Sequence, residues 1–147
     1  MTVAFGADHA GYDLKEELKK YLNQQGVEIK DFGAFSAEPS DYPDFAGAAA
    51  AAVARAECER AVLICGNGVG MCMTANKIPG IRAALCSDTY TARTAREHNN
   101  TNVLCMGARV LGPELARDIL EVWLTTDFSE QDRHVRRLGK VEKIELE

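Results

Sequence analysis

The sequence predicts a single-domain, three-layer α/β/α protein with helices on both faces of a five-stranded, mainly parallel sheet. Five short apolar runs alternate with amphipathic helical patterns along the chain, and this alternation is typical of parallel strands connected by helices. The 147 residues show no low-complexity linker, internal repeat or break in composition. We therefore expect one Rossmann-like domain that spans residues 1–147.

The first half of the chain is expected to supply two strands and two helices. The run Val3–Phe5 predicts the first strand. Apolar side chains then recur at helical spacing from Leu14 to Leu22, and Gly26 is placed to end that helix. Residues 27–32 predict a second strand, and an alanine-rich helix is expected over residues 41–55, with a proline in its first turn.

The second half repeats the same alternation. Apolar runs predict strands at residues 61–65, 81–86 and 102–106. Helical patterns follow at residues 71–77, at residues 88–97 and from Pro113 onward. Parallel sheets bind ligands at the carboxyl ends of their strands, so we expect the functional residues on that edge. The segments that follow the strands there are residues 8–9, 65–70, 87–88 and 107–109.

Charge and cysteine content restrict the classes of partner and the compartment. The net charge of −5 argues against nucleic acid or an anionic membrane as the main partner, although a few arginines can still hold a phosphate. No apolar run approaches the length of a membrane span. The five cysteines are odd in number and form no C-x-x-C pair, which disfavours a disulfide framework or a structural zinc site. We expect a cytoplasmic protein.

The glycine loop at residues 66–70 reads Gly-Asn-Gly-Val-Gly and stands between a buried strand and a helix. Such a loop can turn its backbone N–H groups inward as a cradle for an anion, or it can simply be a tight turn. A dinucleotide fingerprint fits poorly, because Met71 occupies the position of its last glycine. A Walker A loop is excluded more firmly, since no Lys-Ser or Lys-Thr follows.

Cys65 lies at the end of the third predicted strand, directly before this loop. Amide dipoles and a helix N-terminus favour the thiolate form of a nearby cysteine, which can then act as a nucleophile or a base. The alternative is a buried and inert strand cysteine. The segments that contain His9 and His98 are expected to reach the same edge of the sheet. Arg133 and Arg137 stand at an i, i+4 spacing that suits a phosphate, although charged runs usually form solvated faces.

Taken together, these segments resemble ribose-5-phosphate isomerase type B, a family that includes the galactose-6-phosphate isomerase subunits. Seven segments carry the resemblance in family order over nearly the whole chain: residues 6–11, 41–43, 65–70, 75–82, 96–99, 101–103 and 133–134. The resemblance implies that an aldose phosphate and its ketose are interconverted through an enediolate, with ribose 5-phosphate and ribulose 5-phosphate as the substrate pair. It implies no metal and no cofactor.

The resemblance also implies residue roles. Cys65 matches the base that removes the proton next to the carbonyl, and His98 matches the group that opens the sugar ring. The substrate-binding positions that it implies are Asp8, His9, Tyr42, Gly66, Asn67, Gly68, Val69, Gly70, Asn99, Arg109, Arg133 and Arg137. In this family the site is completed across a dimer interface, so residues 133–147 are expected to pack on a neighbouring subunit of a homodimer, which can itself be half of a tetramer.

One position beside the loop distinguishes two subfamilies, and another departs from the family's common pattern, as does Gln131-Asp132, where Gly-Gly is frequent. A second subfamily has a glutamate base where this chain has Met71, which leaves Cys65 as the base here. The middle of the loop is Asn67 where threonine or serine is common, so a six-carbon sugar phosphate of the allose or galactose type remains an alternative substrate. A noncatalytic sensor of sugar phosphates or nucleotides on the same scaffold is the alternative outside enzymes.

Overall fold

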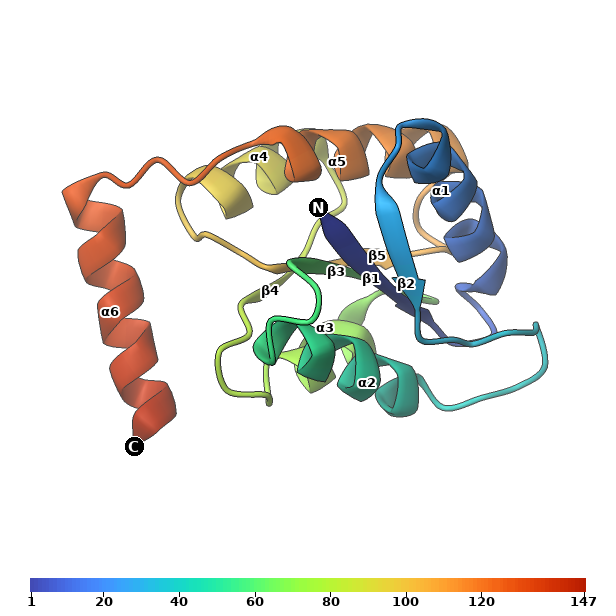
Figure 1. The fold of residues 1–147 in the computed structure, drawn as a ribbon, viewed down its shortest axis with the longest axis horizontal. Coiled ribbons are helices and arrows are strands. Elements are labelled where there is room, and N and C mark those ends of the chain that lie inside the picture. The colour runs from blue at the N-terminus through green and yellow to red at the C-terminus, as the bar shows by residue number, and fades with distance from the viewer.

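A computed structural model describes residues 1–147, which form one sheet of five strands and six helices (Figure 1). The strands are β1 (Thr2–Ala7), β2 (Glu28–Asp31), β3 (Arg60–Cys65), β4 (Ala83–Leu85) and β5 (Val103–Gly107). The helices are α1 (Tyr12–Gln24), α2 (Tyr42–Ala54), α3 (Val69–Ala75), α4 (Thr89–Glu97), α5 (Pro113–Thr125) and α6 (Asp132–Leu146).

The strand order is β2-β1-β3-β5-β4, and every neighbouring pair is parallel. The sheet is thus wholly rather than mainly parallel. The chain moves outward from β1 in one direction to β2 and in the other to β3. The carboxyl ends of β1 and β3 therefore flank a topological switch point, where open α/β sheets leave a crevice for a ligand. In the register, Cys65 at the end of β3 lies opposite Gly107 at the end of β5.

Helices cover both faces of the sheet, which confirms the predicted three layers. α1, α4 and α5 pack on one face, and α2 and α3 pack on the other (Figure 1). Successive residues of β3 alternate between the two cores: Val62 and Ile64 face the first, whereas Leu63 and Cys65 face the second. This alternation follows from the two-residue period of a strand. The side chain of Cys65 is thereby turned toward the α2 and α3 layer.

The predicted element boundaries are correct within two residues, and β4 is shorter than predicted. The apolar run at residues 81–86 predicted a six-residue strand, but only Ala83–Leu85 joins the ladder. The N–H of Ile81 donates to the Ile78 carbonyl within a turn, and that of Arg82 donates to Asn102 Oδ1 at 2.8 Å. A turn and a side-chain acceptor therefore occupy the two N–H groups that a longer strand would need.

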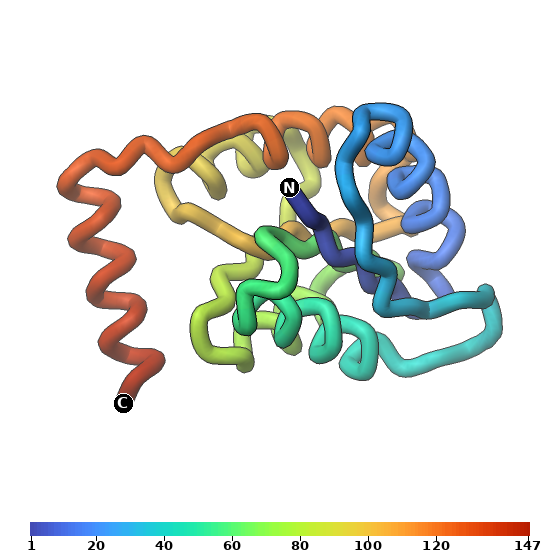
Figure 2. The backbone as a smooth tube through the Cα atoms, viewed as in Figure 1, coloured from blue at the N-terminus to red at the C-terminus, as the bar shows by residue number.

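Helix α6 stands apart from the layered body, on the side of the molecule away from α1 (Figures 1 and 2). Only His134 is buried on it and Leu138 is half-buried, whereas its other large apolar side chains are exposed; these are Val135, Val141, Ile144 and Leu146. Near its end, Glu145 accepts the N–H of Gly80 at 3.2 Å. An apolar stripe on an exposed helix is normally covered by another surface. No helix of the protein has both the length and the apolar character needed to cross a bilayer.

A buried ion pair holds the segment that follows β2. The Lys15 side chain is fully buried and its Nζ donates to both carboxylate oxygens of Asp31, at 2.8 and 2.7 Å, and to the carbonyl of Ala34. Lys19 donates to the same carboxylate at 2.6 Å. These contacts tie α1 to the end of β2 and fix the start of the loop that runs back toward α2.

Candidate functional site

The carboxyl edge of the sheet contains a cavity of about 490 Å³, called the Cys65 cavity below. It lies where β1 and β3 end and where α2 and α3 begin, which is the switch point of the sheet. The lining residues are Asp8, Tyr42, Cys65, Gly66, Asn67, Val69, Gly70, Met73, Arg109 and Val110. Eight of these ten residues were predicted from the sequence to bind or act on substrate. Met73 and Val110 were missed, because nothing distinguishes them locally from ordinary exposed apolar residues.

Cys65 is the candidate reactive group of the cavity. Its side chain is only 4% exposed, yet it lines the cavity wall, and its Sγ accepts the N–H of Gly68 at 3.2 Å. An amide donor directed at sulfur stabilises a thiolate more than a neutral thiol. The strand cysteine is thus buried, as its position predicted, but it is in contact with an open cavity and with a loop amide.

The glycine loop serves both as a tight turn and as a source of free amides. Gly68 has φ of +81°, and a Cβ on it would lie 2.5 Å from Leu85 Cδ1. The N–H of Gly68 donates to Cys65 Sγ, and the N–H of Val69 donates to Asn67 Oδ1 at 3.0 Å. No hydrogen bond within the chain uses the N–H groups of Gly66, Asn67 or Gly70. These three amides, rather than all five of the loop, are available to an anion.

Two side chains define the walls beside this loop. The Tyr42 ring lies so close to Gly70 that a Cβ there would overlap it. The guanidinium of Arg109 lies over Gly66, with NH1 3.4 Å from the position of an added Cβ, and the backbone N–H of Arg109 donates to the Gly66 carbonyl at 3.0 Å. Arg109 is the only cationic side chain that lines the cavity. It is placed to attract a negatively charged group.

Asp8 and His9 leave β1 at this edge and have structural contacts of their own. Asp8 Oδ1 accepts the N–H groups of Ala10 and Gly11, at 3.0 and 3.2 Å, and so shapes the turn into α1. His9 exchanges two hydrogen bonds with Ser40: its backbone N–H donates to Ser40 Oγ at 3.1 Å, and its Nδ1 accepts the Ser40 N–H at 3.2 Å. A neutral ring that accepts at Nδ1 holds its proton at Nε2, so His9 can still donate from that atom. Asp8 lines the cavity, whereas His9 lies beside it.

Six of the residues that the resemblance implies do not line this cavity. His9 and Gly68 directly adjoin lining residues along the chain, whereas the other four come from α4 and α6 or their ends; they are His98, Asn99, Arg133 and Arg137. The expectation that the segment of His98 shares an edge with Cys65 is therefore wrong. His98 directly follows the last residue of α4, and β5 begins only a few residues later, at Val103. A helix that follows a parallel strand returns to the amino edge of the sheet, so the end of α4 must lie there.

The length of β5 separates Cys65 from the end of α4. Cys65 lies opposite Gly107 at the carboxyl end of that strand, whereas the end of α4 leads into Val103 at its amino end. The four residue steps from Val103 to Gly107 span about 13 Å. No local sequence signal shows this separation, because it depends on the direction in which α4 returns across the sheet.

The residues at the amino edge form a second group. The rings of His98 and His134 are stacked, with centroids 4.3 Å apart and planes 12° from parallel. His134 is 5% exposed, and its Nε2 is buried without a hydrogen-bond partner. Burial lowers the pKa of His134, and the nearby Arg133, His98 and Arg137 lower it further, so this ring is neutral near pH 7. The pairing of these histidines could not be read from the sequence, because they come from segments that are distant along the chain.

No three histidine, cysteine or carboxylate side chains are grouped closely enough to hold a metal ion. Neither group of residues is therefore assigned as a metal site.

Comparison with known proteins gives a consistent result over the whole chain. Residues 3–141 match the family described as Ribose/Galactose Isomerase. Ribose-5-phosphate isomerase B of Escherichia coli is 47% identical over 143 residues, which cover 97% of this chain and 95% of that protein. D-erythrulose-4-phosphate isomerase of Pectobacterium atrosepticum is 46% identical over 132 residues, which cover 87% of this chain and 85% of that protein. The solved structure of Clostridium thermocellum ribose-5-phosphate isomerase B has a TM-score of 0.97 and 47% identity, covering 99% of this chain and 98% of that one.

Proposed function

Because the chain belongs to the ribose/galactose isomerase family, we propose that it interconverts ribose 5-phosphate and ribulose 5-phosphate through an enediolate. The observation that carries this proposal is the position of Cys65. Its sulfur borders a cavity together with free loop amides and the guanidinium of Arg109. This combination supplies a base, a site for developing negative charge and a cation for a phosphate.

In the proposed reaction, Cys65 acts as the base. Its thiolate takes the proton from C2 of the open-chain aldose, and the electron pair of that C–H bond forms the C1–C2 double bond of the enediolate. The free amides of Gly66, Asn67 and Gly70 support the negative charge on oxygen. The Cys65 thiol then returns a proton to C1, while the proton of the C2 hydroxyl passes to the oxygen on C1, and the ketose results.

We propose that a second copy of the chain completes each site. Four residues implied for ring opening, substrate contact or phosphate binding lie outside the Cys65 cavity of their own chain; they are His98, Asn99, Arg133 and Arg137. The length of β5 prevents a side-chain rotation from bringing His98 across. A twofold dimer in which the amino edge of one chain meets the carboxyl edge of the other would form two identical sites. The exposed apolar stripe of α6 supports such an arrangement, with residues 133–147 packed on the partner.

The first test replaces the proposed base. Cys65→Ala should lower kcat by about 10²- to 10⁴-fold on ribose 5-phosphate, the range expected for loss of a general base. Cys72→Ala is the matched control, because Cys72 lies outside the cavity and should leave kcat within about twofold. Activity that survives largely intact in Cys65→Ala would show that another group removes the proton.

The preferred sugar should be determined with a panel of four-, five- and six-carbon aldose phosphates. The five-carbon substrate is expected to give the highest kcat/KM. The D-erythrulose-4-phosphate isomerase relative supports a four-carbon phosphate as the second candidate. Asn67 is exposed at the cavity, and its Nδ2 is free because only its Oδ1 is hydrogen-bonded. If a six-carbon phosphate reacts faster, Asn67 is therefore the residue to exchange for Thr or Ser. Ligand binding without turnover of any sugar phosphate would instead indicate a sensor.

We also propose that the protein works in the cytoplasm. All five cysteines are free thiols, which is the state that a reducing compartment maintains.

A further inference from the structure

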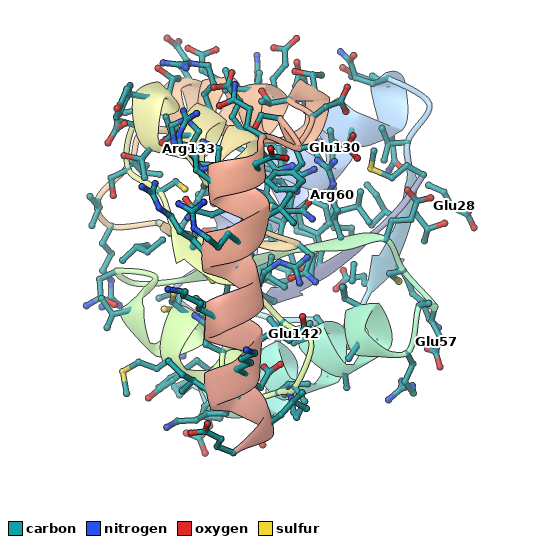
Figure 3. All side chains as sticks on the ribbon, turned by 90° about the vertical axis from the view of Figure 1, so that its left-hand side faces the viewer. Glu28, Glu57, Arg60, Glu130, Arg133 and Glu142 are labelled. Carbon is teal, nitrogen blue, oxygen red and sulfur yellow. The ribbon has the colours of Figure 1, made fainter.

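Three arginines gather at the amino edge of the sheet, at the other end of the strands from Cys65. Arg60 is the first residue of β3, Arg82 directly precedes β4, and Arg96 lies in the last turn of α4. Arg96 is only 6% exposed, and the other two are half-buried. Figure 3 views the molecule from the side on which α6 stands, where Arg60 and the beginning of α6 at Arg133 can both be seen.

The hydrogen-bond partners of these arginines are all neutral. Arg60 NH1 donates to the carbonyls of Trp123 and Leu124, at 2.9 and 3.2 Å, and its guanidinium lies over the Trp123 ring. Arg82 Nε donates to the carbonyl of Asn100 at 2.7 Å. The partners of Arg96 are the carbonyls of Thr126 and Thr101 and the side-chain oxygen of Asn100.

No carboxylate forms a salt bridge with any of the three, although the protein carries a net charge of −5. Asp127 acts on Arg60 and Arg96, and Glu59 on Arg60, only at a distance. Burial lowers the pKa of Arg96 to about 10, and the charges of Arg60 and Arg82 contribute to the shift. Buried positive charge that lacks a counter-charge is costly. The cluster thus has the electrostatic character of a site for an anion.

The arginines border a cavity of about 360 Å³. Several donors remain free there: Nε and NH2 of Arg60, NH1 and NH2 of Arg82, and NH2 of Arg96. The remaining lining residues are the polar Asn100 and Asn102, the exposed Glu59, and Val53, Ala56 and Cys58, which form an apolar wall. Guanidinium groups bind phosphate oxygens in a forked geometry, and the apolar wall provides space for a small organic group.

We propose that this cavity binds a phosphate monoester with a small organic part, at a site separate from the Cys65 cavity. The two sites lie at opposite ends of β3, because Arg60 begins that strand and Cys65 ends it. Neither the proposed isomerase reaction nor its residues involve Arg60, Arg82 or Arg96, so the second site stands independently of the proposed function.

The test uses inorganic phosphate as the probe and thermal unfolding of the full chain as the measurement, with chloride at matched ionic strength as reference. Phosphate at ten times its dissociation constant should raise the Tm by roughly 4 °C. Arg82→Gln should lose the part of this rise that the amino-edge site contributes, while the part contributed by the active-site arginines and the isomerase activity stay. Arg82 is chosen because it has a single carbonyl partner, so its replacement disturbs the fold least. Arg82→Lys keeps the charge and should retain part of the rise.

Arg109→Gln is the matched control, because Arg109 belongs to the Cys65 cavity. This variant should keep the phosphate-dependent rise of the amino-edge site although it weakens substrate binding. The proposal is overturned if Arg82→Gln and the unmodified chain gain equal stability from phosphate, or if Arg109→Gln alone abolishes the gain. Either result would mean that the three arginines only hold backbone carbonyls in place.

Discussion

The Tyr42 ring and the backbone of Gly70 lie in direct contact at the Cys65 cavity. The ring occupies the space that any side chain at position 70 would need. Since Gly70 also offers a free amide to the cavity, the fit between these two residues controls both the shape of the wall and the direction of that N–H group.

Gly70→Ala should consequently displace the ring or the loop and lower kcat/KM by about tenfold or more, the order of loss expected when one oxyanion donor is misplaced. Gly47→Ala in α2 is the control, because no atom lies within 4 Å of its added Cβ. That variant should keep full activity and gain up to about 1 kcal/mol of stability from improved helix propensity. Steady-state kinetics and thermal unfolding of both variants measure the difference, and equal activities would contradict the steric argument.

The cysteines outside the Cys65 cavity should differ in reactivity. A hydrogen bond from Cys105 lowers the pKa of Cys72 to about 7, and Cys72 is partly exposed. Burial raises the pKa of Cys58, and raises that of Cys86 to about 12. Iodoacetamide at pH 7 should therefore label Cys72 faster than Cys58, Cys86 or Cys105. Peptide mass spectrometry over a time course measures the order, with Cys72→Ser as control. Comparable labelling rates would contradict it.

At the scale of elements, the contact between α1 and the end of β2 depends on a fully buried lysine and its carboxylate partner. Burial alone would raise the pKa of Asp31, but hydrogen bonds from Lys15 and Lys19 outweigh it, so the pKa lies below its ordinary value. A carboxyl group of this kind stabilises the fold above its unfolded pKa of about 4, and the contribution is lost as the pH falls through the lower folded value.

Asp31→Asn should thus destabilise the protein at pH 7 by about 3 kcal/mol, because it leaves the buried Lys15 with only the more exposed and more distant carboxylate of Glu16, at 3.7 Å, as a counter-charge. The variant should also lose less stability than the original chain when the pH is lowered below about 4. Glu16→Gln, which removes a more exposed partner of Lys19, should cost less than about 1 kcal/mol. Urea unfolding at several pH values measures both effects. A parallel pH dependence of the Asp31→Asn and original chains would exclude this role of the carboxylate.

At the scale of the whole molecule, the two groups of proposed site residues lie at opposite edges of one sheet. Cys65 and Arg109 stand at the carboxyl edge, and His98 ends α4 at the amino edge. The proposed dimer therefore predicts that each active site combines residues from two chains.

Mixing two inactive variants tests this arrangement. Cys65→Ala and His98→Ala should each be nearly inactive, but co-refolding them in equal amounts should restore about a quarter of the original activity, since half of the dimers are mixed and each mixed dimer has one intact site. Co-refolding either variant with itself is the control. A mixture that stays inactive, while size measurements show that mixed dimers form, would contradict a shared site.

The sequence by itself determined the alternation of strands and helices, the local turn at residues 66–70 and the place of Cys65 before it. These features depend on apolar periodicity and on glycine and proline positions within a few residues of one another. It also identified most of the cavity lining, because residues that directly follow parallel strands share one edge.

Only the tertiary structure decided that His98 lies at the other edge, stacked on His134, and that two of the five loop amides are already bonded. It alone brought Arg60, Arg82 and Arg96 to one cavity and left the apolar stripe of α6 exposed. These facts depend on strand order and on packing between segments that are distant along the chain. Local periodicity carries no information about such contacts, since the same helical pattern fits many relative placements.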